Sequence, residues 1–246
     1  MARVALVTGA ARGLGAAMAK RLGRDGFRVA VNYCHSREKA ETVADDIAAN
    51  GGVARAFQAD VTREEDVKRL LKEIDSELGT VEILVNNATG PQPERPLEEY
   101  SWRDFQDQID FFIKAPYYLT FNLLEAMKKA RWGRIINIGS EVAINCRSNF
   151  STYVAAKSAL AGLTKSWALE FAAWNIAVNL VAPGWVPTER HADVSSAVIE
   201  AYRKTVPMGR LGLDAEVAAA VAFFAAEENG FVSGQCIAVN GANTVH

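Results

Sequence analysis

The chain has 246 residues, half of them hydrophobic, and is near the upper size for a single core, so we expect one domain over residues 1–246. Its 27 Lys and Arg residues against 29 Asp and Glu residues argue against nucleic acid or acidic membrane as partners. Three unevenly spaced cysteines, a first apolar run too short for a signal peptide and no apolar stretch of about 18 residues predict a cytoplasmic protein without disulfides or metal.

A glycine-rich turn follows the first apolar run. Residues 3–7 form a short run rich in β-branched side chains, which predicts a buried strand, and a helix-forming stretch begins after Gly15. The turn between them reads Thr8-Gly9-Ala10-Ala11-Arg12-Gly13-Leu14-Gly15. Such a turn lets backbone N–H groups approach a pyrophosphate at a helix N-terminus, so we interpret it as a nucleotide site rather than an ordinary loop.

Apolar runs and helical patterns then alternate along the whole chain. This alternation predicts an α/β fold, a single doubly wound Rossmann domain whose seven-stranded parallel sheet carries helices on both faces. Strands are expected near 3–8, 27–32, 53–58, 82–85, 133–139, 176–182 and 236–239, and helices near 14–24, 36–50, 63–78, 98–129, 151–173, 190–204 and 214–226. We expect the helix over 98–129 to break near Pro116, and Thr62 to cap the helix over 63–78.

Tyr153 and Lys157 lie four residues apart on the predicted helix over 151–173, so they share one face. A free tyrosine titrates near pH ~10, and acid–base work at neutral pH requires a shift of roughly 2–3 pKa units, which a neighbouring ammonium favours. Ser140 ends a predicted strand upstream. The tyrosine and lysine alone are a common chance pair, but with Ser140 and the glycine turn they predict a proton-transfer site.

The turn spacing, Gly9-x-x-x-Gly13-x-Gly15 after Thr8, resembles the cofactor motif of the short-chain dehydrogenase/reductase family. Further family motifs occur in order: Asp60-Val61, Asn86-Asn87-Ala88, Ser140, Tyr153-x-x-x-Lys157 and Pro183-Gly184. The resemblance covers essentially the whole chain and is nearest to the 3-oxoacyl-[acyl-carrier-protein] reductase-like branch. It implies an oxidoreductase that moves a hydride between a nicotinamide and a carbonyl or secondary alcohol, with a 3-oxoacyl thioester as one candidate substrate.

The resemblance also implies roles for individual residues. Tyr153 would transfer the proton, Ser140 would hydrogen-bond the substrate oxygen, and Lys157 would tune Tyr153 and bind the nicotinamide ribose. The implied cofactor contacts are Gly9, Arg12, Gly13, Leu14, Gly15, Asp60, Val61, Asn87, Ala88, Tyr153, Lys157, Pro183, Gly184, Val186 and Thr188. Asp60 has the alternative role of a helix cap only.

The end of the second predicted strand bears on which cofactor binds. An NAD site of this kind normally carries Asp or Glu there, whereas this chain has no carboxylate before Glu38. Two cations and small polar donors would instead meet a 2′-phosphate, which favours NADP(H); they are Arg12, Asn32, His35, Ser36 and Arg37. The alternative for both arginines is a solvent-facing side chain.

Phe112 stands where the family usually carries a catalytic asparagine. Phenylalanine cannot hold the water that links the lysine to bulk solvent. Either Asp110 or a shifted water fills this role, or the proton relay is impaired and the protein is a catalytically weak NADP-binding sensor or scaffold. Thr89 and Asn240-Gly241-Ala242 also depart from the family pattern. The intact Ser140, Tyr153 and Lys157 favour an active enzyme.

Three further segments concern substrate and assembly. The loop from Gly90 to Pro96 is expected at the mouth of the active site, and the segment from Pro183 to Gly209 is expected to cover the substrate, with Arg190 and His191 facing either an anion or solvent. The helix over 151–173 is apolar on more than one face, which favours burial of one face against another subunit. Family likeness favours a homotetramer, a dimer of dimers, and we expect Trp167 and Phe171 at the interface.

Overall fold

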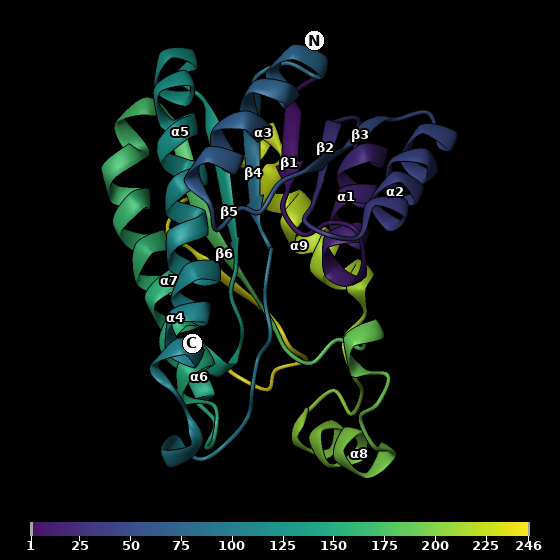
Figure 1. Ribbon diagram of the computed structural model, residues 1–246, viewed down its shortest axis with the longest axis vertical. Coiled ribbons are helices and arrows are strands. Elements are labelled where there is room, and N and C mark those ends of the chain that lie inside the picture. Colours follow the sequence, from purple (N-terminus) through teal and green to yellow (C-terminus); the bar gives the residue numbers. More distant parts are fainter. Residues whose placement is uncertain (1, 246) are drawn as a thin grey trace.

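The computed structural model describes residues 2–245, except for the side chain of Arg190. Seven parallel strands form one sheet in the order β3-β2-β1-β4-β5-β6-β7 (Figure 1). The strands are β1 Val4–Val7, β2 Arg28–Tyr33, β3 Val53–Gln58, β4 Val81–Asn86, β5 Gly133–Ile138, β6 Ile176–Pro183 and β7 Cys236–Val239. The predicted fold class and the seven strand positions are confirmed. The order reverses between β1 and β4, the place where doubly wound sheets bind ligands at their carboxyl edge.

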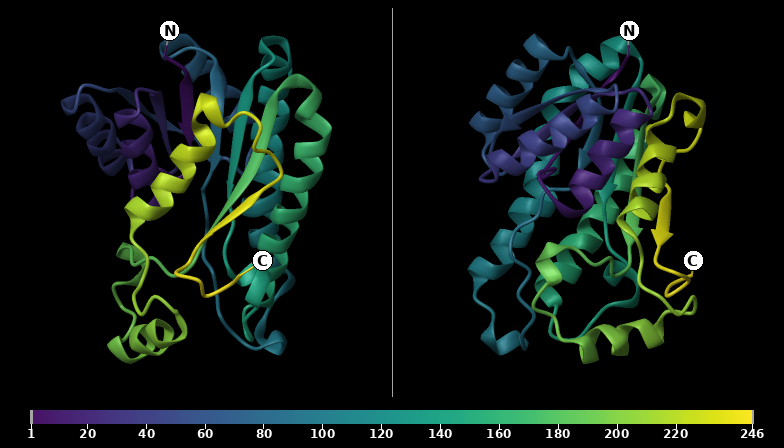
Figure 2. Two further views of the ribbon diagram at one scale, coloured as in Figure 1. Left: turned by 180° about the vertical axis from the view of Figure 1, so that it is seen from behind. Right: turned by 90° about the vertical axis from the view of Figure 1, so that its right-hand side faces the viewer.

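Helices cover both faces of the sheet (Figures 1 and 2). The α-helices are α1 Gly13–Arg24, α2 Arg37–Ala49, α3 Glu64–Glu77, α4 Trp102–Ile109, α5 Ala115–Ala130, α6 Val142–Asn145, α7 Ser151–Phe171, α8 Ser196–Thr205 and α9 Asp214–Ala225. Alternate residues of β1 face opposite sides, because side chains alternate along a strand. Ala5 and Val7 pack with α1, α2 and α9, whereas Val4 and Leu6 pack with α3, α5 and α7.

The helix predicted over 98–129 is interrupted earlier than expected. A π-helical turn, Asp110–Lys114, separates α4 from α5, and Pro116 lies in the first turn of α5. Proline lacks the N–H that would bond the carbonyl of Phe112 four residues before it, so a widened turn at this point costs little. Short 3₁₀ turns, Leu97–Glu99 and Glu189–His191, also occupy parts of the chain where longer helices were predicted.

Two other predictions are wrong. Thr62 does not cap α3: the helix begins after Arg63, and the Thr62 backbone N–H and hydroxyl both donate to the Asp60 carboxylate. Phe171, expected at a subunit interface, is only 3% exposed and belongs to the core below α7; Trp167, predicted with it, is partly buried against the same cluster, and its place at an interface stays a prediction. On the outer side of α5 and α7 the exposed apolar residues are Tyr117, Phe121 and Leu169, the last of them 85% exposed.

Among the described residues, no helix has the length and apolar content needed to cross a membrane. Over the same part of the chain, no group of three or more His, Cys, Asp and Glu residues is arranged to hold a metal ion.

Candidate active site

The glycine turn lies against the end of β4. Gly9 has a φ of +61°, and a Cβ on it would lie 2.9 Å from the Ala88 Cα. Gly13 has a φ of +54° and faces the Thr188 side chain from the segment that follows β6. Only glycine combines this left-handed backbone with such close approach, so the sequence of the turn follows from its position between β4 and the segment after β6. The turn and the predicted contacts Ala88 and Thr188 therefore meet at one place.

Two asparagines hold this turn. The Asn32 side chain is 1% exposed; its Oδ1 accepts from the Gly9 N–H at 3.2 Å, and its Nδ2 donates to the Ala59 carbonyl at 3.2 Å. The Asn87 Nδ2 donates to the Thr8 carbonyl at 2.8 Å. Asn32 was predicted to contact the cofactor, but its side chain lies behind the turn and positions it. Sequence reasoning missed this role because a strand-end asparagine looks the same whether it faces a ligand or the protein.

Cations gather on the outer side of the turn. A hollow of about 430 Å³ between α1, α2 and the segment after β6 is lined by Arg12, Lys20, Lys39, Thr188 and Glu189, among others. Lys20 is paired with Asp46 at 2.6 Å, and Arg37 lies 3.5 Å from Glu41 on its own helix. Lys39 lines this hollow together with Arg12, and no pattern in the sequence distinguishes Lys39 from the predicted Arg37. His35 is exposed and Ser36 precedes α2 nearby.

The Asp60 carboxylate is engaged locally. It accepts from the Thr62 N–H at 3.0 Å and from the Thr62 hydroxyl at 2.7 Å. Val61 beside it is buried. Burial, and then the charges of Asp60 and Asp66, raise the pKa of the Cys34 thiol at the end of β2. Asp60 is therefore not the N-cap of α3, which is Arg63, and its carboxylate instead closes the turn before the helix.

Ser140, Tyr153 and Lys157 come from adjoining elements. Ser140 lies two residues after the end of β5, and α7 carries Tyr153 and Lys157 one turn apart. Lys157 is 4% exposed, and its Nζ donates to the Ile138 carbonyl at 2.6 Å. Because Ile138 is the last residue of β5 and lies two residues before Ser140, this bond fixes the lysine against the strand that precedes the serine. Pro183 and Gly184 follow at the end of neighbouring β6, and Val186 is buried beyond them.

Phe112 packs against both members of the α7 pair. The Lys157 Nζ lies 3.7 Å from the Phe112 ring centroid, a cation–π contact. The Phe112 ring also meets the Tyr153 ring edge-on at 5.5 Å between centroids, and the Phe150 ring stacks on Tyr153 at 4.7 Å. The aromatic face therefore occupies the space beside the ammonium where the family resemblance implied a water.

Asp110, one candidate to replace the relay, is bound on its own helix. Its Oδ1 accepts from the Gln106 Nε2 at 2.9 Å and pairs with the Lys114 Nζ at 2.8 Å. The carboxylate is thus used to brace the π-helical turn around Phe112. These contacts weaken the hypothesis that Asp110 fills the relay role.

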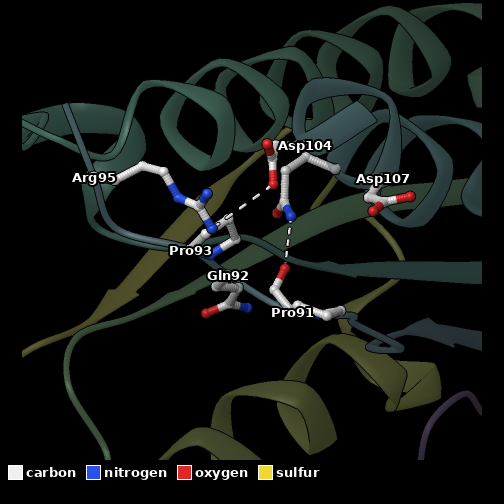
Figure 3. Close-up of a pocket in the computed structure, with 7 residues that line it drawn as sticks. Pro91, Gln92, Pro93, Arg95, Asp104 and Asp107 are labelled. Atoms are coloured by element: carbon white, nitrogen blue, oxygen red, sulfur yellow. Dashed lines mark hydrogen bonds and ion pairs between the residues drawn. The ribbon is translucent and has the colours of Figure 1, made fainter. Parts of the chain in front are cut away.

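A second hollow borders the loop after β4 (Figure 3). It measures about 440 Å³ and is lined by Pro91, Gln92, Pro93, Arg95, Asp104, Asp107 and Gln108. The Gln108 Nε2 donates to the Pro91 carbonyl at 2.7 Å, and Arg95 lies 4.0 Å from Asp104. A Cβ on Gly90 would clash with the Phe111 ring, so the loop is held against the π-helical turn that carries Phe112. The loop is therefore joined to the helix that packs on Tyr153.

His191 lies in the segment after β6, where its Nδ1 accepts from the Thr188 N–H at 3.2 Å and its ring meets Trp185 edge-on at 5.5 Å. These contacts use the His191 Nδ1 as an acceptor and stabilise the segment itself. The Arg190 side chain, its predicted companion, lies outside the described part of the structure.

Comparison with known proteins gives consistent matches along the chain. The family model described as short chain dehydrogenase matches residues 3–198. The 3-oxoacyl-[acyl-carrier-protein] reductase FabG of Staphylococcus aureus is 38% identical over 241 residues, covering 98% of both chains, and that of Pseudomonas aeruginosa is 38% identical, covering 97% of this chain and 96% of the relative.

Two solved structures have the same fold as this chain over nearly its whole length. A protein of Agrobacterium tumefaciens provisionally named gluconate dehydrogenase aligns with a TM-score of 0.94 at 30% identity, covering 99% of this chain and 97% of its own. A mutant of a Serratia marcescens short-chain dehydrogenase/reductase aligns with a TM-score of 0.92 at 32% identity, covering 99% of this chain and 98% of its own.

Proposed function

Because this chain belongs to the short-chain dehydrogenase/reductase family, we propose that it is an NADP(H)-dependent oxidoreductase acting on a carbonyl or secondary alcohol. One observation carries the proposal: Lys157, one helical turn from Tyr153, is fixed to the carbonyl of Ile138, two residues before Ser140. The chain's own residues fit a dinucleotide, since Gly9 and Gly13 keep a left-handed turn free of side chains at the α1 N-terminus.

The turn around Gly9 and Gly13 would hold a nicotinamide cofactor, which when bound would supply the hydride for the carbonyl carbon in the proposed reduction. Tyr153 gives its hydroxyl proton to the carbonyl oxygen, and Ser140 donates a hydrogen bond that orients this oxygen. The product is a secondary alcohol, and the remaining phenolate is stabilised by the Lys157 ammonium. The reverse reaction moves the proton from the alcohol to the phenolate.

Phe112 gives Lys157 a different environment from a water-linked lysine. Its ring face stabilises an ammonium that is almost fully buried, and the Ile138 carbonyl accepts one of its protons. In this arrangement Lys157 acts as a fixed positive charge, and Tyr153 recovers its proton from the substrate side after each turnover. The alternative function, a weakly active NADP-binding sensor or scaffold, is favoured by the same ring if that recovery is too slow.

The preference for NADP(H) is supported by position and charge. The β2 strand ends without a carboxylate, and Arg12 and Lys39 line one hollow beside the turn. The substrate class is proposed more broadly. The reductase names of the curated relatives support a 3-oxoacyl thioester, and the name of the Agrobacterium relative supports a sugar acid.

We propose further that the chain forms a single cytoplasmic domain and assembles as a homotetramer. The exposed apolar side chains of Tyr117, Phe121 and Leu169 on α5 and α7 support one subunit contact on that face.

The proposal is tested by incubating the wild-type protein with NADPH and with NADH against a panel of 3-oxoacyl thioesters, ketones and sugar acids, and with the oxidised cofactors against alcohols. We expect turnover of at least one member of the panel, measured by the change in cofactor absorbance. Tight NADPH binding without turnover across the panel would instead identify the sensor or scaffold.

A further inference from the structure

Helix α8, which belongs to the segment covering the site, lacks an apolar anchor of its own. None of its described side chains is buried. Figure 1 shows it below the sheet, away from the helices that pack on the two faces. A ten-residue helix without a buried face is marginal in water, so its position must depend on specific contacts.

One such contact is made by Tyr202 of α8. Its hydroxyl donates to the Glu141 carboxylate at 2.6 Å and accepts from the Trp185 backbone N–H at 2.8 Å. The Trp185 ring also meets the Tyr202 ring edge-on at 5.3 Å. Burial, and then the bond to Glu141, raise the pKa of Tyr202, so its phenol remains a protonated donor. Tyr202 thus links α8 to the ends of both β5 and β6.

Glu141 is the residue directly after Ser140, and it is buried at 4% exposure. Its second carboxylate oxygen accepts from the Asn243 Nδ2 at 3.1 Å, and its backbone N–H donates to the Pro183 carbonyl at 3.0 Å. Burying a carboxylate is costly unless its oxygens are hydrogen-bonded, and here each oxygen has a donor from a different segment. These hydrogen bonds connect Glu141 to three segments that are distant in the sequence.

The C-terminal segment also contacts the residues that directly follow α8. The Met208 N–H donates to the Gly241 carbonyl at 3.2 Å, and Gly241, with a φ of +63°, packs closely on Val206. Glu141 therefore lies where the serine-bearing strand, the covering helix and the C-terminal segment meet.

We propose that Glu141 is a positioning residue: through Tyr202 it fixes α8 as the wall that closes the substrate space beside Ser140. This inference rests on the proposed oxidoreductase function. Loss of the contact frees α8 from the catalytic strand and weakens substrate binding more than the chemical step, because Tyr153 and Lys157 are held by α7 and β5.

The experiment compares Glu141→Ala, Glu141→Gln and Tyr202→Phe with wild type, using Val198→Ala, an exposed change on the same helix, as the matched control. With the best substrate of the panel, Glu141→Ala and Tyr202→Phe are expected to raise KM about fivefold or more while kcat changes by less than about threefold. Glu141→Gln keeps an oxygen that accepts from Tyr202, and rotation of the Asn243 amide presents its oxygen to the new Nε2, so this variant is expected to stay within about twofold of wild type.

Trypsin gives a readout that does not depend on activity. Arg203 and Lys204 lie in α8 and are exposed, so cleavage there reports how often the helix leaves its place. We expect cleavage about fivefold faster in Glu141→Ala and Tyr202→Phe, and wild-type rates in Glu141→Gln and Val198→Ala.

Unchanged KM and cleavage in Tyr202→Phe would overturn the inference, even if Glu141→Ala fails to fold. A Glu141→Gln variant as defective as Glu141→Ala would also overturn it, because the accepting oxygen would then be irrelevant. If wild type turns over no panel substrate, the proposed function falls, and the cleavage rates alone decide whether Glu141 fixes α8.

Discussion

The Lys157 ammonium lies against the face of Phe112, 3.7 Å from the ring centroid, and the same ring meets Tyr153 edge-on. A buried ammonium normally needs a carboxylate or water, and here an aromatic face contributes to its stabilisation.

Replacing Phe112 by leucine should therefore lower kcat/KM roughly tenfold, because it removes a cation–π contact of about 1–2 kcal/mol while keeping the site apolar. Phe111→Leu, in the adjacent ring that packs on Gly90, is the matched control. Steady-state kinetics with NADPH check both. Phe112→Asn separates the two hypotheses for the relay: a rate above wild type identifies the missing water as the defect, and a rate below it supports the aromatic contact.

Tyr153→Phe should reduce kcat/KM by about 100-fold or more, since it removes the group that exchanges the proton with substrate. Cofactor affinity, measured by fluorescence titration, should change little. Tyr117→Phe, an exposed tyrosine on α5, controls for loss of a hydroxyl. A loss below tenfold would contradict the proton-transfer role.

NADPH should bind more tightly than NADH. Arg12→Ala and Lys39→Ala should each weaken NADPH binding by about 1.5–3 kcal/mol and leave NADH nearly unaffected, because a charge-assisted phosphate contact is lost. Arg37→Ala should have a smaller effect, since Arg37 already pairs with Glu41. Lys68→Ala on α3 is a control for general charge, and equal wild-type affinities for the two cofactors would refute the phosphate pocket.

Leu169→Glu and Phe121→Glu should yield smaller species with reduced turnover, because an unpaired charge is costly in an apolar contact. Trp102→Glu, at a similarly exposed apolar position on α4, should leave the assembly intact. Sedimentation velocity measures the species, and a wild-type protein that is monomeric at micromolar concentration would count against the interface on α5 and α7.

The spacing of apolar residues and the positions of glycine and proline were enough to predict the sheet and the helices that cover it. Runs such as Val4–Val7 are apolar on both faces because both faces are buried, and glycines mark the turn at α1. The errors concern what a side chain bonds, which composition does not report. Asn32 serves the turn, Thr62 bonds Asp60 rather than α3, and Phe171 turns into the core although it shares α7 with exposed Leu169.

Only part of the candidate site was predictable from the sequence. Spacing alone places Tyr153 and Lys157 together, and the strand end places Ser140 nearby. Lys39, Glu141 and Tyr202 act across elements distant in sequence, so only the folded chain shows which of many similar residues meet.

The π-helical turn at Asp110–Lys114 is in effect a one-residue insertion within a helix. Each residue advances an α-helix by about 100°, so deleting one residue here would leave α4 and α5 helical but rotate one against the other. Phe112 would then point away from Lys157, while Leu119 and Leu123 could keep their places in the core. At this turn the position of Phe112 relative to Lys157 can change without a change in the packing of α5. An insertion or deletion here would therefore affect catalysis more than folding.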